Sequence, residues 1–157
     1  MISYVIQVFT ALMGSLGFAI IFKMKRRHLA AACIGGGTTW IVYLLCVHFG
    51  LDIFFSNLIA TLFASAYSEI MRNLCRTPRT VFVIPAVVPL IPGSSLYYAM
   101  SELVAENENL AAEHAVQTGL VAGAIAFGIL LFTVIFHVVH KIVRLIRSRN
   151  ISMQDIF

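Results

Sequence analysis

The sequence predicts an all-α integral membrane protein that forms a single transmembrane domain over residues 1–157. Hydrophobic residues make up 60% of the chain and charged residues only 11%. A membrane helix needs about 20 mostly apolar residues, and about five such stretches occupy most of the sequence. They cover, in order, residues 2–22, 29–49, 53–71, 80–100 and 116–140. The longest connection, 101–115, is too short for a soluble domain, so a catalytic domain outside the bilayer is excluded.

The distribution of charge predicts how these helices cross the membrane. Basic residues follow the first, third and fifth stretches: Lys23, Lys25, Arg26, Arg27, Arg72, Arg76, Arg79, Lys141, Arg144, Arg147 and Arg149. Five crossings place all of them on one face, which the positive-inside rule makes cytoplasmic. We therefore expect the N-terminus outside, the C-terminus inside and a basic cytoplasmic tail at 141–157.

Acidic residues gather on the opposite face, namely Asp52, Glu102, Glu106, Glu108 and Glu113. The basic clusters then set the orientation and contact anionic headgroups of the lipid bilayer. This arrangement favours a lipid partner over a nucleic-acid partner.

A polar face runs along the third stretch. Asn57, Thr61, Ser65 and Glu69 recur every four residues and so share one side of a helix. Such a face should lie against protein or water rather than lipid. Two interpretations stay open: hydrogen bonds that join helices, worth about 1 kcal/mol each, or the wall of a substrate path.

Glu69 is the only acidic residue within any predicted span, and Arg72 follows three residues later. One interpretation is an ion pair near the end of the helix. The other is proton coupling, in which the carboxylate takes up a proton during transport, because intramembrane carboxylates often serve as proton relays.

The fourth stretch is interrupted. Its segment "VIPAVVPLIPGSSLYYAM", Val83–Met100, holds three of the four prolines of the chain. Each proline removes a backbone donor and clashes with the preceding helical turn. Gly93 permits a change of direction, and Ser94 and Ser95 are suited to capping a second helix. We therefore expect two half-helices around an unwound centre.

Transporters bind substrates at such breaks, where the positive end of a half-helix faces an anionic group. The expected substrate-path residues around the break are Pro89, Pro92, Gly93, Ser94, Ser95, Tyr97 and Tyr98. The tyrosines would contact or gate a small-molecule substrate. The alternative is a kinked structural helix whose free backbone groups bond to neighbouring helices.

Two groups of glycines are expected at helix-packing faces. Gly35, Gly36 and Gly37 stand together in the second stretch. They favour a close helix crossing, with a flexible or unwound segment as the alternative. Gly119 and Gly123 form a small-xxx-small pattern in the fifth stretch that would contact the first or second helix, or another chain.

Enzymatic chemistry is not expected. The three cysteines form no CxxC pair, and His137 and His140 have no third metal ligand nearby. No Ser/His/Asp set or phosphate loop is present. We expect no catalytic residues, no metal and no cofactor.

Two segments carry a family resemblance: "GFAIIFKMKRRHLAAACIGGG" and "TPRTVFVIPAVVPLIPGSSLYYAM". They resemble the threonine/serine exporter family, and within it the small-subunit or C-terminal-half type found in the bacterial succinate exporter. The resemblance implies export of threonine, serine or dicarboxylates such as succinate across the bacterial cytoplasmic (inner) membrane, driven by the proton gradient. It also implies a large subunit as partner in a hetero-oligomer.

The predicted topology agrees with such a pairing. A five-helix half that begins outside would follow a related half that begins inside, and the two would form inverted repeats around a shared site. The alternative function is a scaffold that stabilises a partner membrane protein without transporting anything itself.

Overall fold

The computed structural model describes residues 2–154, with side chains placed for residues 4–142. This part of the chain contains no strand. Its elements are α1 (Ile2–Ile21), α2 (Arg26–His48), α3 (Ile53–Cys75), α4 (Thr80–Val87), the 3-10 helix η1 (Val88–Leu90), α5 (Gly93–Val104) and α6 (Glu108–Gln154). Apolar segments adopt helices because a helix satisfies its own backbone groups away from water.

Four of these helices, α1, α2, α3 and α6, are long and apolar enough to cross a membrane. A fifth span arises if Thr80–Leu90 and Gly93–Val104 are taken together, across a bend of 53°. The predicted all-helical membrane architecture with about five spans is therefore confirmed. The orientation, with the N-terminus outside, stays a prediction.

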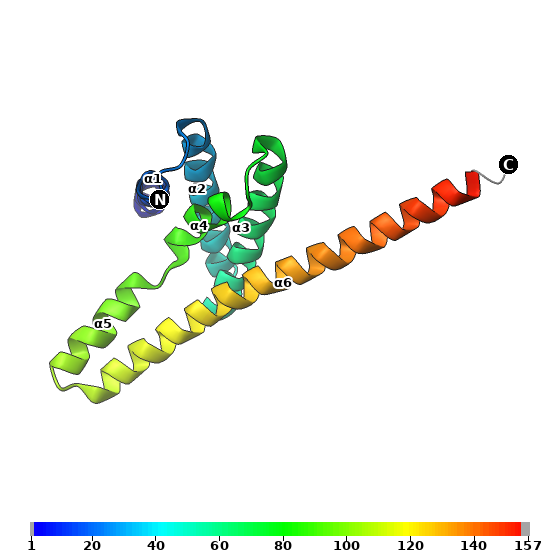
Figure 1. Cartoon of the computed structure of the whole chain (residues 1–157). Coiled ribbons are helices and arrows are strands. Elements are labelled where there is room, and N and C mark those ends of the chain that lie inside the picture. The colour runs from blue at the N-terminus through cyan, green and yellow to red at the C-terminus, as the bar shows by residue number, and fades with distance from the viewer. Residues whose placement is uncertain (1, 155–157) are drawn as a thin grey trace.

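The helices form a bundle from which a hairpin projects. In Figure 1, α1, α2, α3 and α4 gather together, while α5 and α6 run side by side away from them. The long α6 crosses α3 on its way, and α3 is its main contact with the bundle. As a result, α5 has α6 as its main neighbour and leaves most of its large side chains uncovered.

The glycine triplet of α2 lies where α1 and α3 approach α2 closely. A Cβ atom at Gly36 would overlap the side chain of Ser15 in α1, and one at Gly37 would overlap Leu12. A Cβ at Gly35 would lie 2.6 Å from the ring of Tyr67 in α3. Helix α2 continues without interruption through the triplet.

Polar contacts reinforce the same crossing. The Tyr67 hydroxyl donates to the Ala31 carbonyl at 2.6 Å, and the Cys33 thiol donates to the Leu12 carbonyl at 3.3 Å. An apolar cluster of four buried residues lies next to this crossing, where α3 packs on α4. Its members are Ala64, Val83, Ala86 and Val87, and Ile125 of α6 packs against them. Small side chains dominate because lipid supplies no hydrophobic drive, so association depends on close packing.

The predicted break in the fourth stretch is present. Pro85 is accommodated inside α4, and the helix then tightens into η1 before Ile91 becomes extended, with φ −62° and ψ 126°. Gly93 is the first residue of α5 and has no positive φ. The change of direction therefore comes from Ile91 and Pro92, rather than from glycine.

The two serines do not cap α5 as expected. The helix begins at Gly93, one residue before them, so Pro92 occupies the capping position and no side-chain cap forms. The Ser95 hydroxyl instead donates back to the Pro92 carbonyl at 3.2 Å.

The last helix is longer than the fifth stretch suggested. Only residues 105–107 separate α5 from α6, and Glu106 there has a positive φ of 61°. The 47 residues of α6 extend for about 70 Å at 1.5 Å per residue, more than twice the roughly 30 Å of a bilayer core. It continues through most of the expected tail, of which residues 155–157 lie outside the described part.

Candidate functional site

A small cavity lies where the broken helix meets α2, α3 and α6. Its volume is about 220 Å³, and we call it the break cavity. The residues that line it are Trp40, Tyr43, Ile53, Asn57, Pro89, Leu90, Ile91, Pro92, Ser94, Ser95, His114, Gln117 and Val121. Drug-sized ligands occupy pockets of about 300–1,000 Å³, so this cavity suits a small metabolite.

Five residues predicted from the sequence meet in this cavity: Asn57, Pro89, Pro92, Ser94 and Ser95. The two serines belong to the first turn of α5, whose backbone N–H groups have no acceptor within the helix. These amides, together with the helix dipole, favour a negatively charged group at this end of α5.

Four further polar or aromatic residues of the cavity were missed by sequence reasoning: Trp40, Tyr43, His114 and Gln117. The rings of Trp40 and Tyr43 lie 4.9 Å apart and form an aromatic wall. The indole Nε1 of Trp40 is buried, and no residue that the structure describes accepts a hydrogen bond from it. Buried N–H groups are normally paired, so this donor is available to a ligand. The one sequence feature that could have pointed to this site is Trp40, the single tryptophan of the chain, within an apolar helix.

The polar face of α3 extends from the break cavity into the protein. The Asn57 amide donates to the Ile53 carbonyl at 2.8 Å. Thr61 and Ser65 are fully buried, and neither hydroxyl has a hydrogen-bond partner within the described part of the chain. At Thr61 the face is closed by α6, because a Cβ atom at Gly128 would lie 3.0 Å from the threonine side chain.

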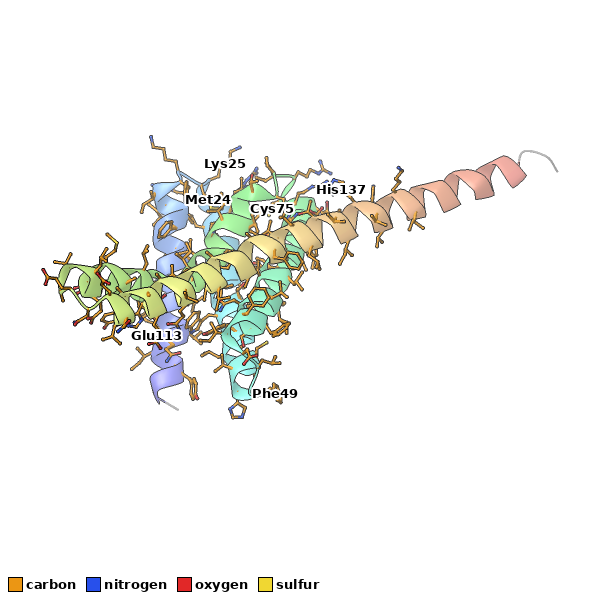
Figure 2. All side chains as sticks on the ribbon, turned by 90° about the horizontal axis from the view of Figure 1, so that it is seen from below. Met24, Lys25, Phe49, Cys75, Glu113 and His137 are labelled. Atoms are coloured by element: carbon orange, nitrogen blue, oxygen red, sulfur yellow. The ribbon has the colours of Figure 1, made fainter. Side chains whose placement is uncertain are left out.

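A second cavity lies at the other end of this polar face. It measures about 650 Å³ and is bordered by Glu69, Arg72 and Asn73 of α3, by Arg79, and by Phe136, His137, His140 and Lys141 of α6. We call it the basic-end cavity, because it lies at the end of the bundle where the α1–α2 and α3–α4 links carry basic residues. Figure 2 shows Met24, Lys25 and Cys75 at this end of the bundle and Phe49 at the opposite end.

Glu69 is buried and pairs with Arg72, whose Nη1 lies 2.7 Å from its Oε1. The ion pair expected as one interpretation is therefore formed. Asn57 and Glu69 are twelve residues apart, about 18 Å along the helix, so the polar face joins the two cavities. A role of Glu69 in proton coupling stays a prediction.

Arg79 precedes α4 and reaches across to α6. Its Nη1 donates to the Thr133 hydroxyl at 2.9 Å, and its guanidinium lies 4.9 Å from the centre of the Phe132 ring. Burial lowers the pKa of Arg79 from its ordinary value, while the Glu69 carboxylate opposes this effect. The group stays charged, because arginine is not deprotonated in proteins.

Other residues predicted from the sequence lie outside both cavities. Tyr97 is 67% exposed and Tyr98 is 50% exposed, and the Tyr98 ring lies 5.6 Å from that of His114. Gly93 lies beside the break cavity without lining it. A Cβ atom at Gly119 or Gly123 would meet nothing within 4 Å. Contact at these two glycines would therefore require another chain.

Comparison with known proteins decides the family. The profile of the family described as "Threonine/Serine exporter, ThrE" matches residues 7–135, which run from the first half of α1 into α6 and include all the helices between them. The chain belongs to the threonine/serine exporter family. This is a family of transporters, and the helices described above make this member a multi-pass membrane protein.

One relative is an uncharacterised protein of Haemophilus influenzae, 23% identical over 146 residues. The alignment covers 87% of this exporter-family chain but only 49% of the relative, so the chain spans about half of the relative's length. No solved structure matches the chain.

Proposed function

We propose that this chain is one half of a secondary exporter of small polar metabolites, with the substrate held in the break cavity. The observation that carries the proposal is the cavity itself, which the two half-helices form together with the polar face of α3. Membership of the threonine/serine exporter family supports the same class of activity.

The lining of the cavity suits a substrate that carries a carboxylate. The first-turn amides at Ser94 and Ser95 favour the negative charge, and the Trp40 indole adds a neutral donor. The side-chain amides of Asn57 and Gln117 both donate and accept hydrogen bonds, as recognition of an amino or hydroxyl group requires. Threonine and serine meet this description, and so does a dicarboxylate such as succinate.

The proposed path follows the polar face from the break cavity to Glu69. Thr61 and Ser65 offer unpaired hydroxyls along the way, as a passing polar substrate or water chain would need. Because α6 closes the face at Gly128, movement of α6 relative to α3 would open the path. Release of Glu69 from Arg72 on protonation would couple that movement to the proton gradient.

A partner subunit would complete the path. The α5–α6 hairpin projects from the bundle and is covered on one side only. The relative from Haemophilus influenzae is about twice as long as its matched part, so it is long enough to contain a second unit of similar size. We therefore propose a larger subunit of the same family as the partner, in a bacterial cytoplasmic membrane, with the two halves arranged as inverted repeats.

The test is Gln117→Leu, with Thr10→Val as the control, since Thr10 is exposed on α1 outside both cavities. Export of threonine, serine and succinate is measured per assembled complex in cells without endogenous exporters. We expect Gln117→Leu to reduce export at least about tenfold, because a half-buried hydrogen-bonding partner of the substrate is lost. The control should export normally.

The same experiment separates the alternative function, a scaffold that only stabilises its partner. A scaffold predicts that Gln117→Leu lowers the amount of partner in the membrane while export per complex stays constant. That result would reject the break cavity as a substrate site.

A further inference from the structure

The basic-end cavity contains a cation that is fixed in position and incompletely paired. Arg79 is anchored to α6 on one side, by the hydrogen bond to Thr133 and by the Phe132 ring. Thr133 is itself oriented, because its hydroxyl also donates to the Ile129 carbonyl at 2.6 Å. The guanidinium is therefore positioned before any ligand arrives.

The other side of the guanidinium has no partner. Its Nε and Nη2 atoms are buried, and neither makes a hydrogen bond within the described part of the chain. These two N–H groups point the same way and form the parallel fork that matches the two oxygens of a carboxylate or phosphate. Both atoms are covered by neighbouring atoms, so an anion reaches them only when the surroundings shift. Such an anion would remove the cost of leaving buried N–H groups of a charged side chain unpaired.

The charges around the fork favour an anion as well. Glu69 is the one carboxylate on the cavity wall, and Arg72 already pairs with it at 2.7 Å. Arg79 makes no ion pair with any described residue. Lys141 adds a further positive charge from α6, so the wall stays net positive after the Glu69–Arg72 pair is counted.

We propose that the basic-end cavity is an anion-binding site in which Arg79 holds a carboxylate or phosphate group through its Nε–H and Nη2–H donors. The site is separate from the break cavity and lies at the opposite end of the polar face of α3. Two sources supply this chemistry: the carboxylate of a small metabolite, or the phosphate of an anionic lipid headgroup. The metabolite source rests on the proposed transport, whereas the lipid source does not.

The experiment measures binding to the full chain and needs no transport activity, so its outcome is independent of the export assays. In one arm, succinate and inorganic phosphate are titrated onto the purified chain in neutral detergent. In the other arm, the chain is reconstituted in phosphatidylcholine nanodiscs with and without phosphatidylglycerol, and retained lipid is measured by native mass spectrometry.

The variants are Arg79→Gln and, as a matched control, Arg76→Gln. Arg76 lies in the same α3–α4 link but is exposed and does not border the basic-end cavity. We expect Arg79→Gln to weaken binding by about tenfold or more, since two charge-assisted hydrogen bonds are lost. Lys141→Gln leaves the Thr133 anchor intact and should weaken binding about threefold, which keeps the test informative if Arg79→Gln folds poorly.

Small-anion binding that is weakened in Arg79→Gln would identify a metabolite site, and phosphatidylglycerol retention that is weakened in Arg79→Gln would identify a lipid site; either supports the proposal. Binding that Arg79→Gln leaves unchanged would overturn it, because the anion would then be held elsewhere, for instance in the break cavity. Absence of binding in both arms would overturn it and leave Glu69 as the internal counter-ion of Arg79. An equal loss in Arg76→Gln would also overturn it, because the effect would then come from surface charge.

Discussion

Glycine serves opposite purposes at Gly36 and Gly119. Gly36 lies against the side chain of Ser15 in α1, so its missing Cβ lets the two helices meet. Gly119 faces open space within this chain. Both residues are glycines, so the sequence alone does not tell which of them packs against another helix; the neighbouring helices in the structure do.

This contrast predicts the effect of Gly36→Ala on stability. The added methyl group must displace Ser15, and overpacking of this kind costs about 1–3 kcal/mol. We expect a lower midpoint of thermal unfolding in detergent. Gly119→Ala is the control and should leave the midpoint equal or slightly higher, because alanine favours a helix by about 0.5–1 kcal/mol. Equal midpoints for the two variants would contradict the packing described here.

Trp40 offers a residue-scale test of the substrate site. Trp40→Phe keeps an aromatic ring against Tyr43 but removes the indole N–H together with the second ring of the indole. One neutral hydrogen bond is worth about 0.5–1.5 kcal/mol, so we expect the KM for export to rise about threefold to tenfold at unchanged membrane abundance. An unchanged KM would show that no exported substrate accepts a hydrogen bond from the Trp40 indole N–H.

Among the elements, the broken helix was the one most readily predicted from sequence. Proline interrupts a helix through its own ring and its missing N–H, so the break can be predicted from the position of the proline alone. The residues that face the break depend instead on tertiary packing. Asn57 was found because its four-residue spacing with Thr61 and Ser65 is visible, whereas Trp40 and Gln117 stand alone in their helices.

The start of α6 shows a second limit of local reasoning. Residues 108–115 are polar enough to suggest a surface segment, yet they continue the apolar helix because α5 packs beside them. Alanine, leucine and glutamate in this segment already favour a short helix. The local pattern does not show that this helix is continuous with the apolar span that follows.

Restoring the helix at the break tests the element directly. Pro89→Ala with Pro92→Ala returns two backbone donors and removes the clashes that stop the helix. We expect α4 and α5 to approach one continuous helix and export to fall to background while the protein still inserts. The distance between spin labels on exposed Ile84 and Tyr97 should increase as the 53° bend straightens.

The control for this variant is Pro78→Ala, because Pro78 lies in the α3–α4 link and does not line the break cavity. It should leave both the label distance and export unchanged. Normal export from the double variant would mean that the bend is structural and that the substrate passes elsewhere.

At the scale of the whole molecule, the α5–α6 hairpin projects from the bundle (Figure 1), and it exposes many large apolar side chains. Val104 and Val116 are 84% and 64% exposed, and Leu130 is 63% exposed. Lipid covers part of such a surface in any membrane protein. The uncovered Gly119 and Gly123 add positions where a second helix approaches closely.

Assembly with a large subunit is therefore expected to be sensitive to Gly119→Leu. A Cβ atom at Gly119 would meet nothing within 4 Å, so we expect the thermal midpoint of the isolated chain to stay the same. Recovery of the partner in a pull-down should fall severalfold. Gly14→Leu on α1 is the control, since Gly14 also faces open space. Equal losses in both variants would argue against a partner at the hairpin.

The most direct test of the account measures export from cells that lack endogenous exporters. The chain is expressed alone and beside a candidate large subunit, and threonine, serine and succinate are followed with and without a protonophore. We predict export only when both subunits are present, and its loss on uncoupling. Export by this chain alone, insensitive to the protonophore, would contradict the proposal that it is one half of a proton-driven exporter.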